Sequence, residues 1–146
     1  MRISTKGRYA LRMLLDLAEH QDDGFVALKD IAERQMISKQ YLEQIVTLLN
    51  SSGILRANRG KKGGYMLSLA PSDCTVGQVL RLTEGTLMPV ACLEDEPIRC
   101  DRSGTCKTLP MWIGLKNVIA NYLDSVSLQD MIEQYRDQSS DNYFKI

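Results

Sequence analysis

Two short helical patterns followed by two strand-like runs, all within residues 28–64, constrain this chain more than any other feature. Residues 28–34 form an amphipathic segment, residues 35–37 interrupt it, and Ser38 opens a second helical segment over residues 39–52. Two helices joined this closely predict a helix-turn-helix. Residues 54–58 and 65–69 then flank a basic, glycine-rich tip, which predicts the wing of a winged-helix DNA-binding domain.

The second helical segment has one side for the core and one for solvent. Apolar residues at three- and four-residue steps share the inner side: Tyr41, Leu42, Ile45, Leu48 and Leu49. The outer side carries only polar residues: Lys39, Gln40, Glu43, Gln44 and Thr47. The pattern therefore predicts that the outer side is the one a DNA duplex would meet.

The start of that helix supplies the candidate base contacts. Ser38 suits the N-cap position, because its hydroxyl can accept a hydrogen bond from an amide of the first turn. Ser38, Lys39, Gln40 and Glu43 would line the outward face of the first turns. Gln can pair with adenine and Glu can accept from cytosine, so Gln40 and Glu43 are the candidates for base readout.

The tip between the strands supplies the candidate backbone contacts. Arg59, Lys61 and Lys62 provide charge for phosphates or for a narrow minor groove, and the neighbouring glycines let the backbone approach. The alternative is that the polar helix face is merely solvated and that the tip is an ordinary hairpin loop. The charge distribution argues against that alternative. Residues 1–70 hold 11 Lys and Arg against 7 Asp and Glu, whereas residues 71–146 hold 7 against 11.

Composition places the chain among ordinary globular proteins. With 146 residues, 44% hydrophobic and 25% charged, it can bury one core. No apolar run is long enough to span a membrane, and the first eight residues lack the apolar stretch of a secretion signal, so we expect a cytoplasmic protein without a membrane partner. In that reducing compartment the four cysteines are expected to be ligands, sensors or free thiols.

Other helices are predicted on both sides of this central stretch. Ser4 or Thr5 can cap a first helix that runs to about His20, with Lys6 and Arg8 as weaker DNA-contact candidates and His20 as a surface residue. Val76, Val79, Leu80 and Thr83 form one stripe of a short helix that stops at Gly85, and Cys74 before it is expected to fill the core.

Three cysteines fall in residues 86–107, a segment with no periodic pattern. Their spacing is Cys92-x7-Cys100-x5-Cys106, and three thiols this close on a loop can chelate a soft metal. An iron–sulfur cluster and a zinc ion both accept such ligands, and the spacing does not choose between them. The alternative is three unrelated reduced cysteines.

A long helix is predicted from about residue 108, with Pro110 in its first turn. It carries two apolar stripes, Trp112, Leu115, Ile119, Tyr122 and Val126 on one and Ile113, Ala120 and Leu123 on the other. A helix with two apolar faces needs two partners, which predicts a homodimer; the alternative is a monomeric core helix. Ser127 would cap a last helix, and residues 137–146 read as a polar tail.

These segments give three parts. Residues 1–85 are predicted to form a winged helix-turn-helix DNA-binding domain, residues 86–107 a cysteine-bearing cluster loop, and residues 108–146 the dimerisation helix, a short final helix and the tail. The expected fold is mainly α with a small β wing. A dimer would present two recognition helices to a palindromic operator in double-stranded DNA.

Several motifs together resemble the Rrf-type family of bacterial regulators, and within it the IscR-like iron–sulfur cluster regulators. The resemblance lies in residues 3–9, 37–38, 41–44, 59–60 and 63–65, and in three cysteines before a Trp-bearing helix. It implies a homodimeric winged-helix transcription factor whose DNA affinity changes with the state of a cluster, with a 2Fe–2S cluster favoured over 4Fe–4S. Family positions imply DNA contacts at Ser38, Gln40, Tyr41, Glu43 and Arg59, and cluster ligands at Cys92, Cys100 and Cys106.

The chain departs from that family at three positions. Members with an IscR-like cluster have a histidine where this chain has Leu109, and others take a carboxylate from the partner's first helix where this chain has Arg8. The fourth cluster ligand is therefore unknown, with Asp101, one of residues 94–96 or an external molecule as candidates. The turn position often filled by glycine is Met36, which would carry strain of about 1 kcal/mol or more at positive φ.

The sequence as a whole predicts a transcriptional regulator, a repressor of iron–sulfur assembly or sulfur-metabolism genes, modulated by a cluster on the three cysteines. One alternative is a cluster-free regulator of the same fold that responds to thiol oxidation or to a partner protein. Another is a metal-carrying interaction module without DNA binding. An enzyme is not expected, because the single histidine lies far from any cysteine and no nucleophile set, phosphate loop or paired-carboxylate motif occurs.

Overall fold

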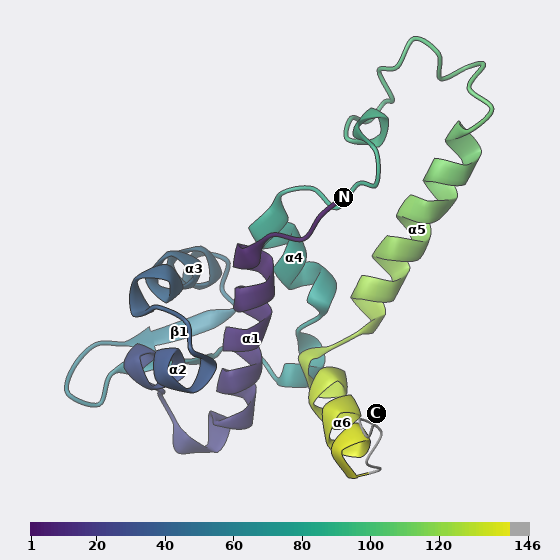
Figure 1. Cartoon of the computed structure of the whole chain (residues 1–146). Coiled ribbons are helices and arrows are strands. Elements are labelled where there is room, and N and C mark those ends of the chain that lie inside the picture. The colour runs from purple at the N-terminus through teal and green to yellow at the C-terminus, as the bar shows by residue number, and fades with distance from the viewer. Residues whose placement is uncertain (141–146) are drawn as a thin grey trace.

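The computed structural model describes residues 1–140 and consists of six α-helices and one small antiparallel sheet (Figure 1). In chain order the elements are α1 (Thr5–Glu19), α2 (Leu28–Gln35), α3 (Lys39–Ser51), β1 (Leu55–Asn58), β2 (Gly64–Leu67), α4 (Val76–Glu84), α5 (Leu109–Ser125) and α6 (Leu128–Ser140). Short 3-10 turns occupy Gln21–Asp23, Pro71–Asp73 and Ala91–Leu93. The predicted class, mainly α with a β wing, is confirmed.

Helix α1 is the centre of the core and packs against α2, α3, α4, α6 and β2. Its inner face is fully or almost fully buried, at Ala10, Met13, Leu14, Leu17 and Ala18. Ser4 is its N-cap, since the Ser4 hydroxyl accepts a hydrogen bond from the Gly7 amide at 3.2 Å. The same hydroxyl donates to the Glu84 carboxylate at 2.7 Å, so the end of α4 holds the start of α1.

Helices α2 and α3 form the predicted helix-turn-helix, with Met36 between them. Met36 has φ 55° and ψ 44°, the left-handed conformation expected for this turn, and its side chain is 90% exposed. The predicted inner face of α3 is confirmed, because Leu42, Ile45 and Leu49 are buried and Tyr41 and Leu48 are half-buried. The predicted outer face is exposed throughout.

The wing is a two-stranded hairpin in which Leu55 pairs with Leu67 and Asn58 with Gly64. Sequence reasoning missed its third partner: Val26 and Tyr65 exchange two backbone hydrogen bonds of 2.8 Å, which tie the wing to the segment before α2. Gly64 is required here, because a Cβ at this position would overlap the backbone carbonyl of Val26.

Helix α4 begins with a capping box, in which Thr75 and Gln78 satisfy each other's backbone amides at 3.2 and 2.9 Å. Its predicted apolar stripe is buried at Val76, Val79 and Leu80. Cys74 is fully buried, and burial raises the pKa of its thiol to about 11. The prediction that Cys74 fills the core is therefore confirmed.

Residues 85–127 extend away from this core, and the chain then returns to the start of α4. The chain passes through the cysteine segment and α5, which packs on α4 and extends away from the other helices (Figure 1). On return, the Val76 amide donates to the Val126 carbonyl and the Leu128 amide to the Cys74 carbonyl, both at 2.9 Å. Helix α6 then packs on α1, with Leu128 and Ile132 in the main core.

The last helix begins as predicted and extends further. The Ser127 hydroxyl accepts from the Asp130 amide at 3.0 Å, and the Asp130 carboxylate accepts from the Ser127 amide at 2.8 Å. Residues 137–140, expected as the start of a polar tail, are exposed but continue α6, while residues 141–146 lie outside the described part of the chain. No helix within residues 1–140 is long and apolar enough to cross a membrane.

Candidate DNA-binding and metal sites

The start of α3 presents the predicted base-contact residues to solvent. The Ser38 hydroxyl accepts a hydrogen bond from the Tyr41 amide at 3.1 Å, so Ser38 is the N-cap as predicted. Lys39, Gln40 and Glu43 are exposed on the following turns, and within residues 1–140 their side chains make no hydrogen bond, although the Glu43 carbonyl accepts one from the Thr47 hydroxyl. Three polar side chains on one rigid helical face are therefore available to a ligand.

Tyr41 differs from these three because its ring is engaged by α1. It is half-buried and meets the ring of Tyr9 edge to face, with centroids 5.5 Å apart and planes at 77°. The Arg12 guanidinium lies 5.2 Å from the Tyr9 ring and donates to both the side-chain oxygen and the backbone carbonyl of Gln35. Helix α1 thus positions the end of α2 and the first turn of α3.

A buried carboxylate on α1 anchors α2 from the other side, and sequence reasoning missed it. Asp16 is only 2% exposed and accepts from Arg34 at 2.7 and 2.9 Å and from Gln35 at 3.0 Å. Burial alone would raise the pKa of Asp16, but the hydrogen bonds and the Arg34 charge outweigh burial and lower it. The signal available was an acidic residue on the apolar face of the first helical pattern, between Met13 and Leu17.

His20 belongs to the same group, so the prediction of a simple surface residue is wrong. Its side chain is half-buried, and Nδ1 lies 2.7 Å from the Asp16 carbonyl oxygen and 3.7 Å from the Asp16 carboxylate. The helix ends at this residue, which brings the ring back over the last turn of α1. Lys6 and Arg8, the weaker DNA-contact candidates, are exposed at the other end of α1.

The wing carries the predicted cations at its tip. Arg59, Lys61 and Lys62 are exposed, and none of them forms an ion pair with a carboxylate in the described residues. The tip therefore presents positive charges, and the outer face of α3 polar groups, to solvent, where an anionic ligand can reach them.

The three candidate metal ligands lie on the segment between α4 and α5 but do not converge. Cys92 and Cys106 are half-buried, Cys100 is exposed, and all are free thiols. Within residues 1–140 no group of three or more Cys, His, Asp or Glu side chains is arranged to hold a metal ion. Of the suggested oxygen ligands, Glu96 pairs with Lys116 at 3.1 Å and Asp95 lies 3.9 Å from Arg99.

The chemistry of the donors does suit a soft metal. The Cys106 sulfur lies 3.3 Å from the Thr108 hydroxyl oxygen. Hydrogen bonds from that hydroxyl and from the backbone amides at the start of α5 lower the pKa of Cys106, which favours the thiolate, the form that binds metals. Three free thiols within fifteen residues, one of them with a lowered pKa, fit an iron–sulfur or zinc centre in donor type.

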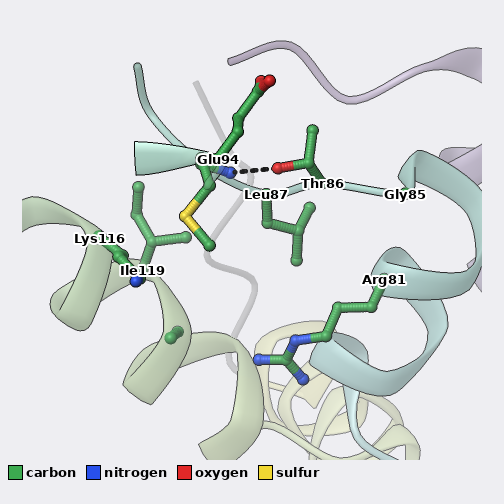
Figure 2. A pocket seen from close by; sticks show the side chains of 9 residues that line it. Arg81, Gly85, Thr86, Leu87, Glu94, Lys116 and Ile119 are labelled. Atoms are coloured by element: carbon green, nitrogen blue, oxygen red, sulfur yellow. Dashed lines mark hydrogen bonds between the residues drawn. The ribbon is translucent and has the colours of Figure 1, made fainter. Parts of the chain in front are cut away.

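A cavity of about 450 Å³ lies where the cysteine segment leaves α4 (Figure 2). Arg81 of α4, Leu87 of the segment and Ile119 of α5 surround it, so it lies between α4 and α5. Its two cations are already paired, Arg81 with Asp124 at 2.7 Å and Lys116 with Glu96. The Arg81 pair fixes the far end of α5 to α4.

Comparison with known proteins identifies the family of the chain. Residues 3–134 match the Rrf2 family, described as iron-dependent transcriptional regulators, and the chain belongs to that family. It is 37% identical over 144 residues to the HTH-type transcriptional regulator CymR of Bacillus subtilis, covering 98% of this chain and 97% of that protein. It is also 37% identical over 142 residues to IscR of Aliivibrio salmonicida, covering 97% of this chain and 83% of IscR.

A solved structure agrees with these matches. The structure of CymR, the global cysteine regulator of B. subtilis, has a TM-score of 0.77 and 35% identity, covering 92% of this chain and 98% of that one. The protein is thus a helix-turn-helix transcriptional regulator of the Rrf2 family, as are the relatives named above.

Proposed function

We propose that the protein is a sequence-specific repressor of iron–sulfur assembly or sulfur-metabolism genes that acts in the cytoplasm on double-stranded DNA. The observation that carries this proposal is the exposed polar face of α3 beside the unpaired cations of the wing. In this arrangement Gln40 and Glu43 read base edges, Ser38, Lys39 and Tyr41 hold the helix in the groove, and Arg59, Lys61 and Lys62 contact phosphates or the minor groove.

Helix α5 supports a homodimer. It has no buried residue, although Met111, Leu115, Val118 and Tyr122 follow one another along one side and are 38–65% exposed. Apolar side chains in such a row are costly to leave in water, and a second copy of the helix would cover them. Two copies would present two recognition helices to the half-sites of a palindromic operator.

The modulator in this proposal is an iron–sulfur cluster, 2Fe–2S in preference to 4Fe–4S, bound by Cys92, Cys100 and Cys106. The iron-dependent character of the family and the donor chemistry of the thiols support it. When bound, a cluster would supply a centre that responds to iron and oxidants. The chain would contribute three cysteine sulfurs and the hydrogen bonds that lower the pKa of Cys106, with Asp101, one of residues 94–96 or an external molecule as the fourth ligand.

A second candidate is a regulator without a cluster, in which the thiols respond to oxidation or a partner protein carries the signal. Two observations favour it. The three thiols are not gathered in the described chain, and one relative of nearly equal length is described as a global cysteine regulator.

The cluster is tested by purification without oxygen, followed by iron and sulfide analysis and an absorption spectrum. Replacing Cys92, Cys100 or Cys106 by Ser should abolish bound iron and sulfide. Cys74→Ala is the matched control, because Cys74 is buried in the core away from the segment, and this variant should keep the cluster. A colourless, metal-free wild-type protein after reconstitution would remove the cluster from the proposal and leave the cluster-free regulator.

DNA binding is tested by titrating the protein with a duplex that it has selected from a random library. Arg59→Ala should weaken binding to that duplex at least about tenfold, since a hydrogen bond from a charged group contributes about 1.5–3 kcal/mol. Arg136→Ala is the matched control, because this arginine is exposed on α6. Equal affinity of wild type and Arg59→Ala would exclude the wing contact.

A further inference from the structure

We propose that the cleft between the second half of α3 and the wing binds one phosphodiester strand of the DNA duplex, and that the side-chain amides of Asn50 and Asn58 position that strand. This inference deepens the proposed function and rests on it. It assigns a role to two residues that the sequence motifs do not mark.

The cleft has a volume of about 450 Å³ and is bounded by α3 on one side and the hairpin on the other. Its polar lining consists of Thr47, Asn50 and Ser51 from α3 and Asn58, Arg59 and Tyr65 from the hairpin. Glu43, Thr47 and Asn50 follow one another at four and three residues, so the cleft continues the same helical face that carries Gln40 and Glu43.

The geometry of duplex DNA predicts that a sugar-phosphate strand passes through this cleft. A major groove and the neighbouring minor groove are separated by a single sugar-phosphate strand. A protein that puts a helix into one groove and a hairpin tip into the next must therefore straddle that strand. In this fold the cleft lies between α3 and the Arg59 end of the hairpin, since residues of both line it.

The charges of the cleft suit an anion. Arg59 is on its rim, and none of the residues that line it is acidic. Four other hollows in the described residues each contain at least one carboxylate, among them Glu94, Asp30, Glu84 and Asp130. A phosphate would therefore meet no repelling charge in this cleft, unlike in the other four.

Asn50 and Asn58 are the donors that remain available. The hydroxyl of Thr47 donates to the Glu43 carbonyl and that of Ser51 to the Leu48 carbonyl, both at 2.9 Å, so these protons are engaged within α3. The side-chain amides of Asn50 and Asn58 make no hydrogen bond within residues 1–140, and both residues are exposed. Neutral donors from both walls fix the register of a phosphate without adding charge.

The test uses the full-length protein and the duplex it selects from a random library. Asn50→Ala and Asn58→Ala should each weaken binding about three- to tenfold, the range of a typical net hydrogen bond. The factor should be the same on a duplex of random sequence, because a phosphate carries no sequence information. Gln40→Ala should instead lose affinity only for the selected duplex, and Gln138→Ala on α6 should bind like the wild type.

A set of duplexes with one neutral methylphosphonate each then locates the contact. Wild type should lose affinity at one phosphate per half-site, between the bases contacted by α3 and the minor groove contacted by the wing. At that position Asn50→Ala and Asn58→Ala should bind as the wild type does, since the partner of each amide has been removed. Thermal unfolding of each variant should match the wild type, because both side chains are exposed.

The inference is overturned if Asn50→Ala and Asn58→Ala bind the duplex as tightly as the wild type. It is also overturned if their loss of affinity relative to the wild type is the same at every methylphosphonate position. Those outcomes would leave the regulator intact, provided that Gln40→Ala and Arg59→Ala still lose affinity. A wild-type protein that enriches no duplex would instead overturn the proposed function, and this inference with it.

Discussion

Replacing Asp16 by Asn should destabilise the protein by removing the buried charge that joins α1 to α2. Asp16 is 2% exposed and accepts three hydrogen bonds from Arg34 and Gln35 at 2.7–3.0 Å. Removing one partner of a buried ion pair costs about 3–5 kcal/mol. Arg34 is 36% exposed and can turn to water, and Asn keeps one acceptor oxygen, so we expect about 2 kcal/mol here.

The measurement is urea and thermal unfolding followed by circular dichroism at pH 7. A loss of 2 kcal/mol should lower Tm by about 5–10 °C for a chain of this size. Asp22→Asn is the matched control, because Asp22 is exposed in the turn after α1 and makes no ion pair within the described residues. If the free energy of unfolding of Asp16→Asn lies within about 0.5 kcal/mol of the wild-type value, the Asp16 carboxylate does not stabilise the fold.

The same pair of proteins gives a pH test. The pKa of Asp16 is lowered in the folded state, so its stabilising contribution is fully present above the unfolded pKa of about 3.9. That contribution is lost as the pH falls through the folded pKa. The stability difference between wild type and Asp16→Asn should therefore be constant near neutral pH and shrink below about pH 4. A difference that grows on acidification would contradict this sign.

Three further changes test other parts of the structure. Met36→Gly should raise the free energy of unfolding by up to about 1 kcal/mol, because glycine removes the left-handed strain at φ 55° and the exposed side chain buries nothing; urea unfolding measures it. Ser4→Ala should lower the free energy of unfolding by about 1 kcal/mol in the same assay, because the α1 cap and the hydrogen bond to Glu84 are lost. The control Ser139→Ala should leave the free energy of unfolding unchanged. Tyr122→Asp should convert a dimer to a folded monomer in sedimentation velocity, and an unchanged sedimentation coefficient would exclude α5 as the interface.

The elements that follow from local patterns were predicted correctly. The cap at Ser38, the buried stripe of α3 and the proline in the first turn of α5 all depend on residues within one or two turns of each other. Such short-range rules are visible in the order of the residues alone.

The features that sequence reasoning missed depend on residues far apart in the chain. The Val26–Tyr65 bridge, the Asp16–Arg34 pair and the packing of α6 on α1 each join segments that are far apart in the sequence. The spacing of apolar residues within one segment does not predict such contacts. His20 was misjudged for the same reason, since its half-buried ring lies over Asp16. The spacing of Cys92, Cys100 and Cys106 likewise gives their separation along the chain but not their arrangement in space.

The antiparallel bridge of Thr75 with Ser127 has a consequence for how this chain can evolve and be engineered. Both ends of residues 76–126 meet at this bridge, but α4 within them packs on α1, so only the cysteine-bearing segment between α4 and α5 lies outside the core as a closed loop. Doubling the length of such a flexible closed loop costs only about 0.6 kcal/mol. This segment can therefore lengthen or shorten while the helix-turn-helix and the wing keep their shape.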